Sequence, residues 1–285
     1  MTAGETAMAH GYAARRTLPL RVEAVRQIRR RRTWIAFGLA AVLPWVLIIA
    51  FQIGGASGGG DGSTSLFDLA TAGGPNFAVM VLFASSSFLS VVAIALFCGD
   101  TVAGEASWSS LRYLLAAPVP RARLLRQKLI IALAYGAATV VGLLAMAWVA
   151  GGLVYGWTGM RLLTGGELPA GVALGRLAIA VAYALVSLLV VAALATLLSV
   201  WTDSPLGAVG GAVGLVIVSN ILNQVTALGN WRQVLPTYWS YAWLDLFQPN
   251  VEWRGVIQGA AVSVSYAIVL LAFAFRHFRT KDVVS

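Results

Sequence analysis

Residues 129–160 read LIIALAYGAATVVGLLAMAWVAGGLVYGWTGM, a run without Asp, Glu, Lys or Arg. A helix of about 20 apolar residues crosses the hydrocarbon core of a bilayer, so this run is long enough to span a membrane. Other charge-free runs are of comparable length and cover residues 34–60, 69–99, 177–202, 204–231 and 255–275.

The composition of the whole chain also indicates a membrane protein. Of 285 residues, 59% are apolar and 11% are charged, whereas a soluble domain has about 25% charged residues. We therefore predict an all-α polytopic membrane protein with six transmembrane helices. The spans are expected near 34–53, 76–98, 129–157, 177–200, 206–227 and 255–275, which form one transmembrane domain (34–275) between cytoplasmic tails at 1–33 and 276–285.

The 20 basic residues are divided unevenly between the two sides of these spans. The N-terminal tail, segment 99–128 and the C-terminal tail hold 8, 5 and 3 of them, and the other side holds four. Because basic residues accumulate in cytoplasmic loops, we expect both termini in the cytoplasm. The net charge of +9 then reflects topology and contact with anionic membrane lipids, and no nucleic acid is expected as a partner.

A basic segment from Leu18 to Arg32 precedes the first span. Its Val22 and Val25 fall at helical spacing, which suits a helix lying along the inner membrane surface. The alternative is a solvated basic flank that only fixes the orientation of the first span.

The residues that usually carry catalysis or bind metals are scarce. Cys98 is the only cysteine, and His10 and His277 lie in opposite tails, so no metal cluster is expected. Neither lysine follows the glycine-rich pattern of a P-loop, so the chain should bind no nucleotide cofactor. The predicted spans also lack the buried carboxylate, His or Lys that ion-coupled carriers usually keep. We predict no catalytic, cofactor-binding or metal site.

Uncharged polar side chains do occur inside two predicted spans. They cluster in the second span, and in the fifth span they share one helical face. They either hydrogen-bond neighbouring helices or line a substrate path, and the pattern does not decide between the two. The candidate path residues are Ser86, Ser90, Asn220, Asn223 and Gln224.

The fifth span also carries Gly207, Gly210, Gly211 and Gly214, which form two overlapping small-x-x-x-small patterns. Such patterns allow helix backbones to approach closely. The contact is either within this chain or with another subunit.

Beyond the fifth span, residues 235–245 are aromatic but too short to span a membrane, and prolines bracket them. We expect an interfacial or re-entrant helix on the outer face.

The segment after the second span predicts a short amphipathic helix over residues 100–117. Asp100 or Thr101 suits an N-cap, and Trp108, Leu111 and Leu115 form one apolar stripe. The stripe lies either on the lipid surface or against a partner protein.

Residues 100–128, DTVAGEASWSSLRYLLAAPVPRARLLRQK, resemble the loop after the second span of ABC-2 type transporter permeases. The resemblance continues in SVWTDSP (199–205) and FRTKD (278–282). One departure is Trp108-Ser109-Ser110, where such proteins more often carry a glycine-threonine pair.

The resemblance implies the membrane subunit of an exporter in the bacterial cytoplasmic membrane. Such a permease pairs with a second copy or a paralogue, and each half sits on a separate ATPase subunit that binds ATP and Mg²⁺. The 100–117 helix would then couple to the ATPase through Gly104, Glu105, Trp108, Leu111, Arg112 and Leu115. The alternatives are an ATP-independent carrier or channel and a non-transporting membrane scaffold.

Overall fold

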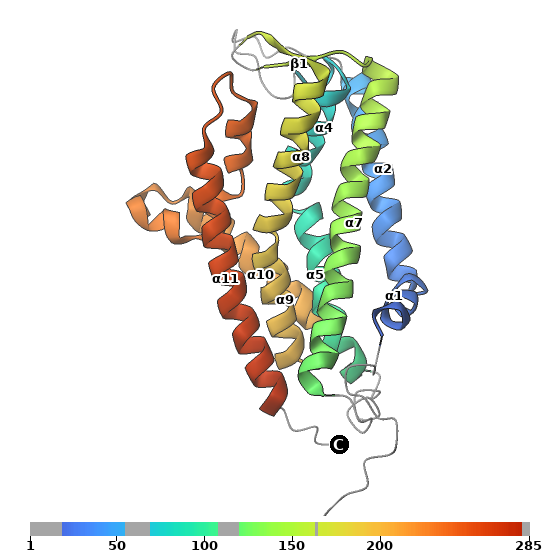
Figure 1. Cartoon of the computed structure of the whole chain (residues 1–285), viewed down its shortest axis with the longest axis vertical. Helices are drawn as coiled ribbons and strands as arrows, with labels where there is room; N and C mark the ends of the chain where they lie inside the picture. Colours follow the sequence, from blue (N-terminus) through green and yellow to red (C-terminus); the bar gives the residue numbers. More distant parts are fainter. Residues whose placement is uncertain (1–18, 55–68, 108–119, 163–164, 281–285) are drawn as a thin grey trace, which may run out of the picture.

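The computed structural model describes residues 19–54, 69–107, 120–162 and 165–280. These residues form helices that run side by side along the long axis of the molecule (Figure 1), with a two-stranded antiparallel hairpin at one end. The elements, in chain order, are α1 (Leu20–Ile28), α2 (Arg31–Gly54), α4 (Gly74–Ser86), α5 (Leu89–Ser107), α7 (Arg121–Tyr155), β1 (Met160–Arg161), β2 (Glu167–Leu168), α8 (Ala170–Ser187), α9 (Leu189–Trp201), α10 (Pro205–Gln224), the 3-10 helices η2 (Thr226–Val234), η3 (Pro236–Trp239) and η4 (Ala242–Phe247), and α11 (Trp253–Thr280).

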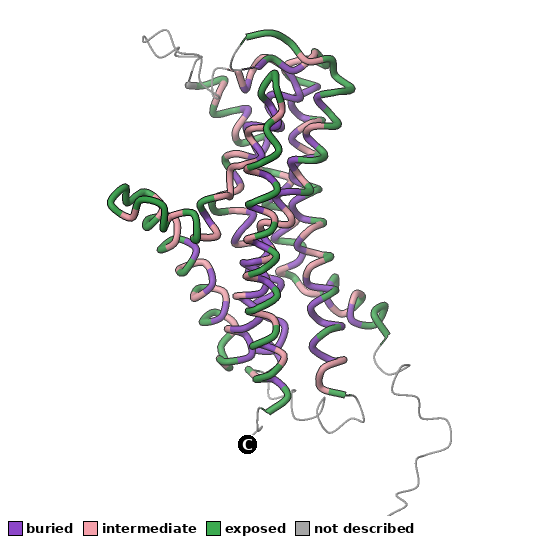
Figure 2. The backbone as a smooth tube through the Cα atoms, turned by 60° about the vertical axis from the view of Figure 1, so that its left-hand side comes forward, coloured by how far each residue is buried: buried purple, intermediate pink, exposed green. Residues whose placement is uncertain are grey.

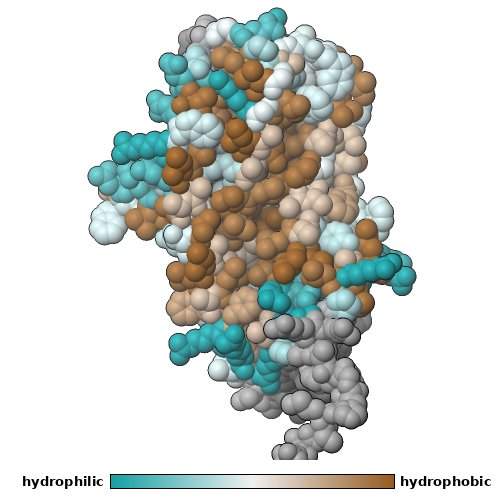
Figure 3. Space-filling model, viewed as in Figure 1, coloured by the Kyte–Doolittle hydropathy of each residue, from teal (hydrophilic) through white to brown (hydrophobic). Residues whose placement is uncertain are grey.

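Six helical segments are long and apolar enough to cross a membrane, namely α2, α5, α7, α8 together with α9, α10 and α11. Figure 3 shows apolar side chains over most of the middle of one face, with hydrophilic side chains toward its ends. The predicted all-α architecture with six spans is confirmed, and the protein is a multi-pass membrane protein.

The second and fourth spans are each broken into two helices. α4 ends at Ser86, and α8 ends at Ser187. The Ser86 hydroxyl donates to the carbonyl of Leu82 at 2.6 Å, and the Ser187 hydroxyl donates to that of Ala184 at 2.9 Å. Hydroxyls that bond back to the preceding turn bend a helix, which is consistent with an interruption at each of these serines.

The prediction of a single helix over 76–98, followed by a new helix capped at Asp100 or Thr101, is wrong. α5 begins at Leu89 and continues through both residues to Ser107. Residues 97–105 of α5 are buried. The helix therefore continues beyond the end of the apolar run.

The hairpin end of the bundle is fixed by close contacts between α4, α7 and β1. A Cβ atom on Gly74 would lie 2.8 Å from the backbone nitrogen of Gly152, so the two helices approach at a distance that only glycine permits. The buried Asn76 side chain donates to the carbonyl of Arg161 and accepts from its backbone N–H, at 2.8 and 3.0 Å. The hairpin is thereby attached to α4.

The segment between α10 and α11 leaves the bundle and returns to it. η2 projects sideways from the upper end of α10 (Figure 2), and its residues include none that is buried. η4 packs back against the bundle, and its Trp243 is completely buried. The helix expected over 235–245 is therefore present as two short 3-10 helices that re-enter the bundle.

Labelling of introduced cysteines tests the predicted orientation. Ser107→Cys and Asn250→Cys place thiols at exposed positions, at the last residue of α5 and in the loop between η4 and α11. This end of α5 and this loop lie toward opposite ends of the bundle (Figure 1). We expect a membrane-impermeant maleimide to label Cys at 250 from outside intact cells and Cys at 107 only after the membrane is opened. The native Cys98 is completely buried and serves as the unreactive background. Labelling of both positions from the same side would contradict this topology.

Candidate functional site

A pocket lies in the middle of the bundle, beside both helix breaks. Its volume is about 90 Å³, and its walls come from α4, α5, α8, α9, α10 and η3. Ser86 and Ser187, the last residues of the two broken helices, both line it. The interruption of two spans at one level therefore opens a space inside the bundle.

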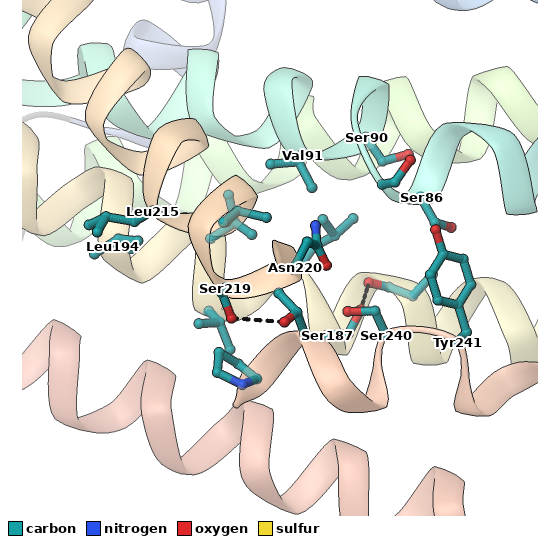
Figure 4. Close-up of a pocket in the computed structure, with 18 residues that line it drawn as sticks. Ser86, Ser90, Val91, Ser187, Leu194, Leu215, Ser219, Asn220, Ser240 and Tyr241 are labelled. Atoms are coloured by element: carbon teal, nitrogen blue, oxygen red, sulfur yellow. Dashed lines mark hydrogen bonds between the residues drawn. The ribbon is translucent and has the colours of Figure 1, made fainter. Parts of the chain in front are cut away.

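The lining of the pocket is uncharged and mixed, because polar side chains alternate with valines and leucines, and apolar groups form most of its surface. Ser219 and Asn220 project from α10 toward the cavity, across from Ser86 and Ser90 (Figure 4). The hydroxyls of Ser219 and Thr237 lie 2.8 Å apart and form a hydrogen bond. The Ser90 hydroxyl is buried and has no hydrogen-bond partner among the described residues. A buried hydroxyl without a partner is energetically costly, so this group is available to a ligand.

The pocket brings together some of the predicted path residues. Ser86, Ser90 and Asn220 line it, although the serines and the asparagine are about 130 positions apart in the sequence. Asn223 and Gln224 do not line it. They lie one turn further along α10, where the helix ends and the chain turns out into η2.

Sequence reasoning missed the contribution of α8 and of the segment around η3. Residues Ser187, Ser219, Thr237, Ser240 and Tyr241 also line the pocket. The aromatic segment 235–245 was recognised as unusual, but its return into the bundle depends on contacts far away in the sequence.

A second polar region lies at the end of the bundle opposite the hairpin, where α1 packs against α5 and α7. Glu105 of α5 is 2% exposed. It accepts hydrogen bonds from Arg26, Arg30 and Lys128 at 2.9, 3.3 and 3.2 Å. Lys128 also binds Glu23 of α1 at 3.1 Å.

Asp100 extends this ion-pair network one turn earlier on α5. Its carboxylate accepts from Arg30 at 2.5 Å and also pairs with Arg32. A Cβ atom on Gly104 would lie about 2.5 Å from the Asp100 carboxylate, so only glycine leaves room for Asp100 in this position. We call Glu23, Arg26, Arg30, Arg32, Asp100, Glu105 and Lys128 the charged cluster.

The charged cluster shows that the basic segment before the first span is a docked helix. α1 contributes Glu23 and Arg26, and Tyr135 of α7 donates to the backbone carbonyl of Ala24 at 2.9 Å. The carboxylates and the lysine of the cluster are buried, and buried charges are stable only when each is paired, so the cluster fixes α1 on α5 and α7.

The predicted coupling residues divide into two groups. Gly104 and Glu105 lie on α5, where Glu105 is buried in the charged cluster, and they are not on a separate surface helix. Trp108, Leu111, Arg112 and Leu115 lie outside the described residues. Their proposed contact with a partner therefore remains a prediction from the sequence.

The glycines of α10 also differ from one another. A Cβ atom on Gly211 would lie 3.1 Å from Leu198 of α9, so this glycine packs within the chain. Gly207 faces only the nearby turn around Ser204. A Cβ atom on Gly210 or Gly214 would meet no atom within 4 Å in the part of the chain that the structure describes, which leaves their face of α10 open there.

Within the part of the chain that the structure describes, no three His, Cys, Asp or Glu side chains are placed to hold a metal ion. The fold and the pocket define a polytopic helical membrane protein with an uncharged cavity among its spans. The profile of a family described as "Protein of unknown function (DUF2705)" matches residues 40–284. The chain belongs to this family. Comparison with curated proteins gives no match.

The charged cluster can be tested by removing its central carboxylate. Glu105→Ala leaves three cations without their shared partner, and loss of one member of a buried pair costs about 3 kcal/mol or more. We expect the free energy of unfolding, measured by SDS titration in mixed micelles, to fall by about this amount. Glu252→Ala removes an exposed carboxylate and serves as the control. Equal stability of the two variants would show that the cluster does not hold the helices together.

Proposed function

We propose that this protein is the membrane-spanning permease of an ABC-2 type exporter, driven by separate ATPase subunits. The observation that supports this function best is the uncharged pocket at the two helix breaks, whose apolar lining carries several hydroxyl groups and an amide. A membrane scaffold needs no such cavity among its spans, whereas a transporter needs a place for its substrate. The broken helices supply polar groups at that level without introducing a charge into the membrane.

The position of the ionisable groups supports an external energy source over ion coupling. Carriers coupled to protons or ions keep an ionisable side chain within the substrate path. The buried carboxylates of α5, Asp100 and Glu105, lie 10 and 15 residues after Ser90, about 15 and 22 Å along the helix axis. Both are outside the pocket, and both are paired with cations.

The pocket also indicates the chemical class of the substrate. Among the described residues no Asp, Glu, Lys, Arg or His lines it, and an ion transferred there would lose its hydration without a counter-charge. Hydroxyl and amide groups can instead bind an uncharged, hydrogen-bonding part of a molecule. We infer that the exported compound is neutral and amphiphilic.

Coupling to the ATPase is proposed to occur through residues 108–117, which directly follow α5. Trp108, Leu111 and Leu115 would insert into the ATPase, and Arg112 would contact its rim. The role we propose for Glu105 is different from the sequence-based one: held by α1 and α7, it would pass a displacement of the docked segment to the bundle.

Assembly is proposed to require a second permease, as an identical copy or a paralogue. The open face of α10 that carries Gly210 and Gly214 is the surface we assign to this contact. The bacterial cytoplasmic membrane, with both termini inside, is the proposed location.

ATP hydrolysis tests the division of labour. The chain purified alone should have no ATPase activity, whereas the complex isolated from its own membranes should hydrolyse ATP. Leu111→Asp puts a charge on the apolar stripe and should remove the co-purifying activity. Ser110→Asp puts the same charge on the opposite face of the expected helix and should leave it. Robust ATP turnover by the chain alone, or equal activity in the two variants, would contradict the proposal.

Access to the pocket should change during the transport cycle. In the complex, Asn220→Cys places a thiol in the pocket lining, and Asn223→Cys places one on the same helix outside that lining. We expect the rate of reaction with N-ethylmaleimide at position 220 to change several-fold when ATP and vanadate are added, and the rate at 223 to stay constant. An unchanged rate at 220 would argue against a pocket that opens with nucleotide binding.

A further inference from the structure

A second, apolar cavity lies on the other side of α5 from the pocket. This groove between α2, α5 and α7 has a volume of about 70 Å³. Its walls include Ile35, Leu39, Leu89, Leu96, Val140 and Leu143. Ile35 and Leu39 are 61% and 56% exposed, so the groove borders the lipid-facing surface of α2.

The polar groups in its wall are few. The Thr139 hydroxyl donates a hydrogen bond to the carbonyl of Tyr135 at 2.9 Å. Ser90 is the other polar residue among those described that line the groove. A groove with this lining suits a hydrocarbon chain, since apolar surface gains most by contact with apolar groups.

A basic residue lies one helical turn before the groove residues of α2. Arg31, Ile35 and Leu39 follow one another at i, i+4 and i+8 in α2, so they share a face of that helix. Arg31 is therefore about 6 Å along the axis from Ile35. It is exposed and forms no ion pair with any described residue.

The surroundings of Arg31 are also positive. The nearby carboxylates are those of the charged cluster, where Glu23, Asp100 and Glu105 are already paired with arginines and Lys128. Counting the cluster, three carboxylates face four cations, and Arg31 adds to this excess. Its place in the first turn of α2 adds the partial positive charge of a helix N-terminus.

We propose that an anionic phospholipid of the surrounding membrane binds here, with one acyl chain in the groove and its phosphate at Arg31. The charge lies at the end of the helix, where lipid headgroups lie, and the groove begins one turn further into the hydrocarbon. A basic residue followed by an apolar groove matches a phospholipid, which has a phosphate and acyl chains. A soluble anion has no apolar part to fill the groove. The lipid would connect α2 to α5 and α7 on the face that the charged cluster does not reach. This inference is independent of the proposed transport function.

Lipid titration of the full-length protein in nonionic detergent tests the site. After removal of native lipid, we expect dioleoylphosphatidylglycerol to bind at one tight site in native mass spectra and to raise the melting temperature. Dioleoylphosphatidylcholine should bind more weakly. Because a basic residue near the surface strengthens binding of an anionic lipid by about five-fold, Arg31→Gln should weaken the phosphatidylglycerol site by that factor.

Two further variants separate the parts of the site. Arg276→Gln removes an exposed arginine from the last two turns of α11. This end of α11 lies at the same end of the bundle as α1 (Figure 1), and the substitution should leave lipid binding unchanged. Val92→Phe fills the groove, since Val92 lines it, and should abolish the tight site while Arg31 is retained. Both Arg31→Gln and Val92→Phe must melt at the wild-type temperature without lipid, which separates loss of the site from loss of the fold.

Several results would overturn the proposal. Equal binding of the two lipids, or wild-type affinity in Arg31→Gln, would exclude recognition of the phosphate. Wild-type affinity in Val92→Phe would exclude the acyl chain from the groove. Inorganic phosphate that stabilises the protein as well as phosphatidylglycerol would identify a simple anion site instead.

Discussion

In the hydrocarbon of a membrane every backbone N–H and C=O must find a partner within the protein, and this requirement governs the whole molecule. It favours unbroken helices, so the interruptions of the α4–α5 and α8–α9 spans need an explanation. Both interruptions follow a serine whose hydroxyl bonds back to its own helix, and both adjoin the same pocket. The cavity therefore lies where the constraint is relaxed, and at each break a serine hydroxyl donates to a backbone carbonyl of the preceding turn.

The charged cluster meets the same constraint in a different way. Asp100, Glu105 and Lys128 are buried in helices that also cross the membrane, yet all three lie within about two turns of a helix end, on the side of α1. There the arginines that precede the first span can reach them. Burial makes each pair depend on the others, because removing one charge leaves its partner in a medium of low dielectric constant. α1 is in this way part of the bundle.

Most of the fold could be predicted from the sequence, because the absence of charge is a local property that each run shows by itself. The break at Ser86 could not, since a serine either points to a neighbouring helix or bonds back to its own. Part of the pocket could be predicted, because Ser90 and Asn220 are polar residues in apolar runs. Thr237 could not, because it joins the pocket only through a re-entrant segment. Glu105 was placed at a partner surface because the arginines that bury it are about 80 residues earlier.

α7 is the longest of the described helices, and its length bears on motion. It continues for 35 residues without a break, roughly 52 Å, from the charged cluster to the hairpin, while the α4–α5 span beside it is interrupted at the pocket. A long unbroken helix transmits a tilt from one end to the other. A tilt of about 5° at one end of such a helix displaces the other by about 4.5 Å, nearly the width of a side chain, and the breaks are the places where the neighbouring helices absorb that difference.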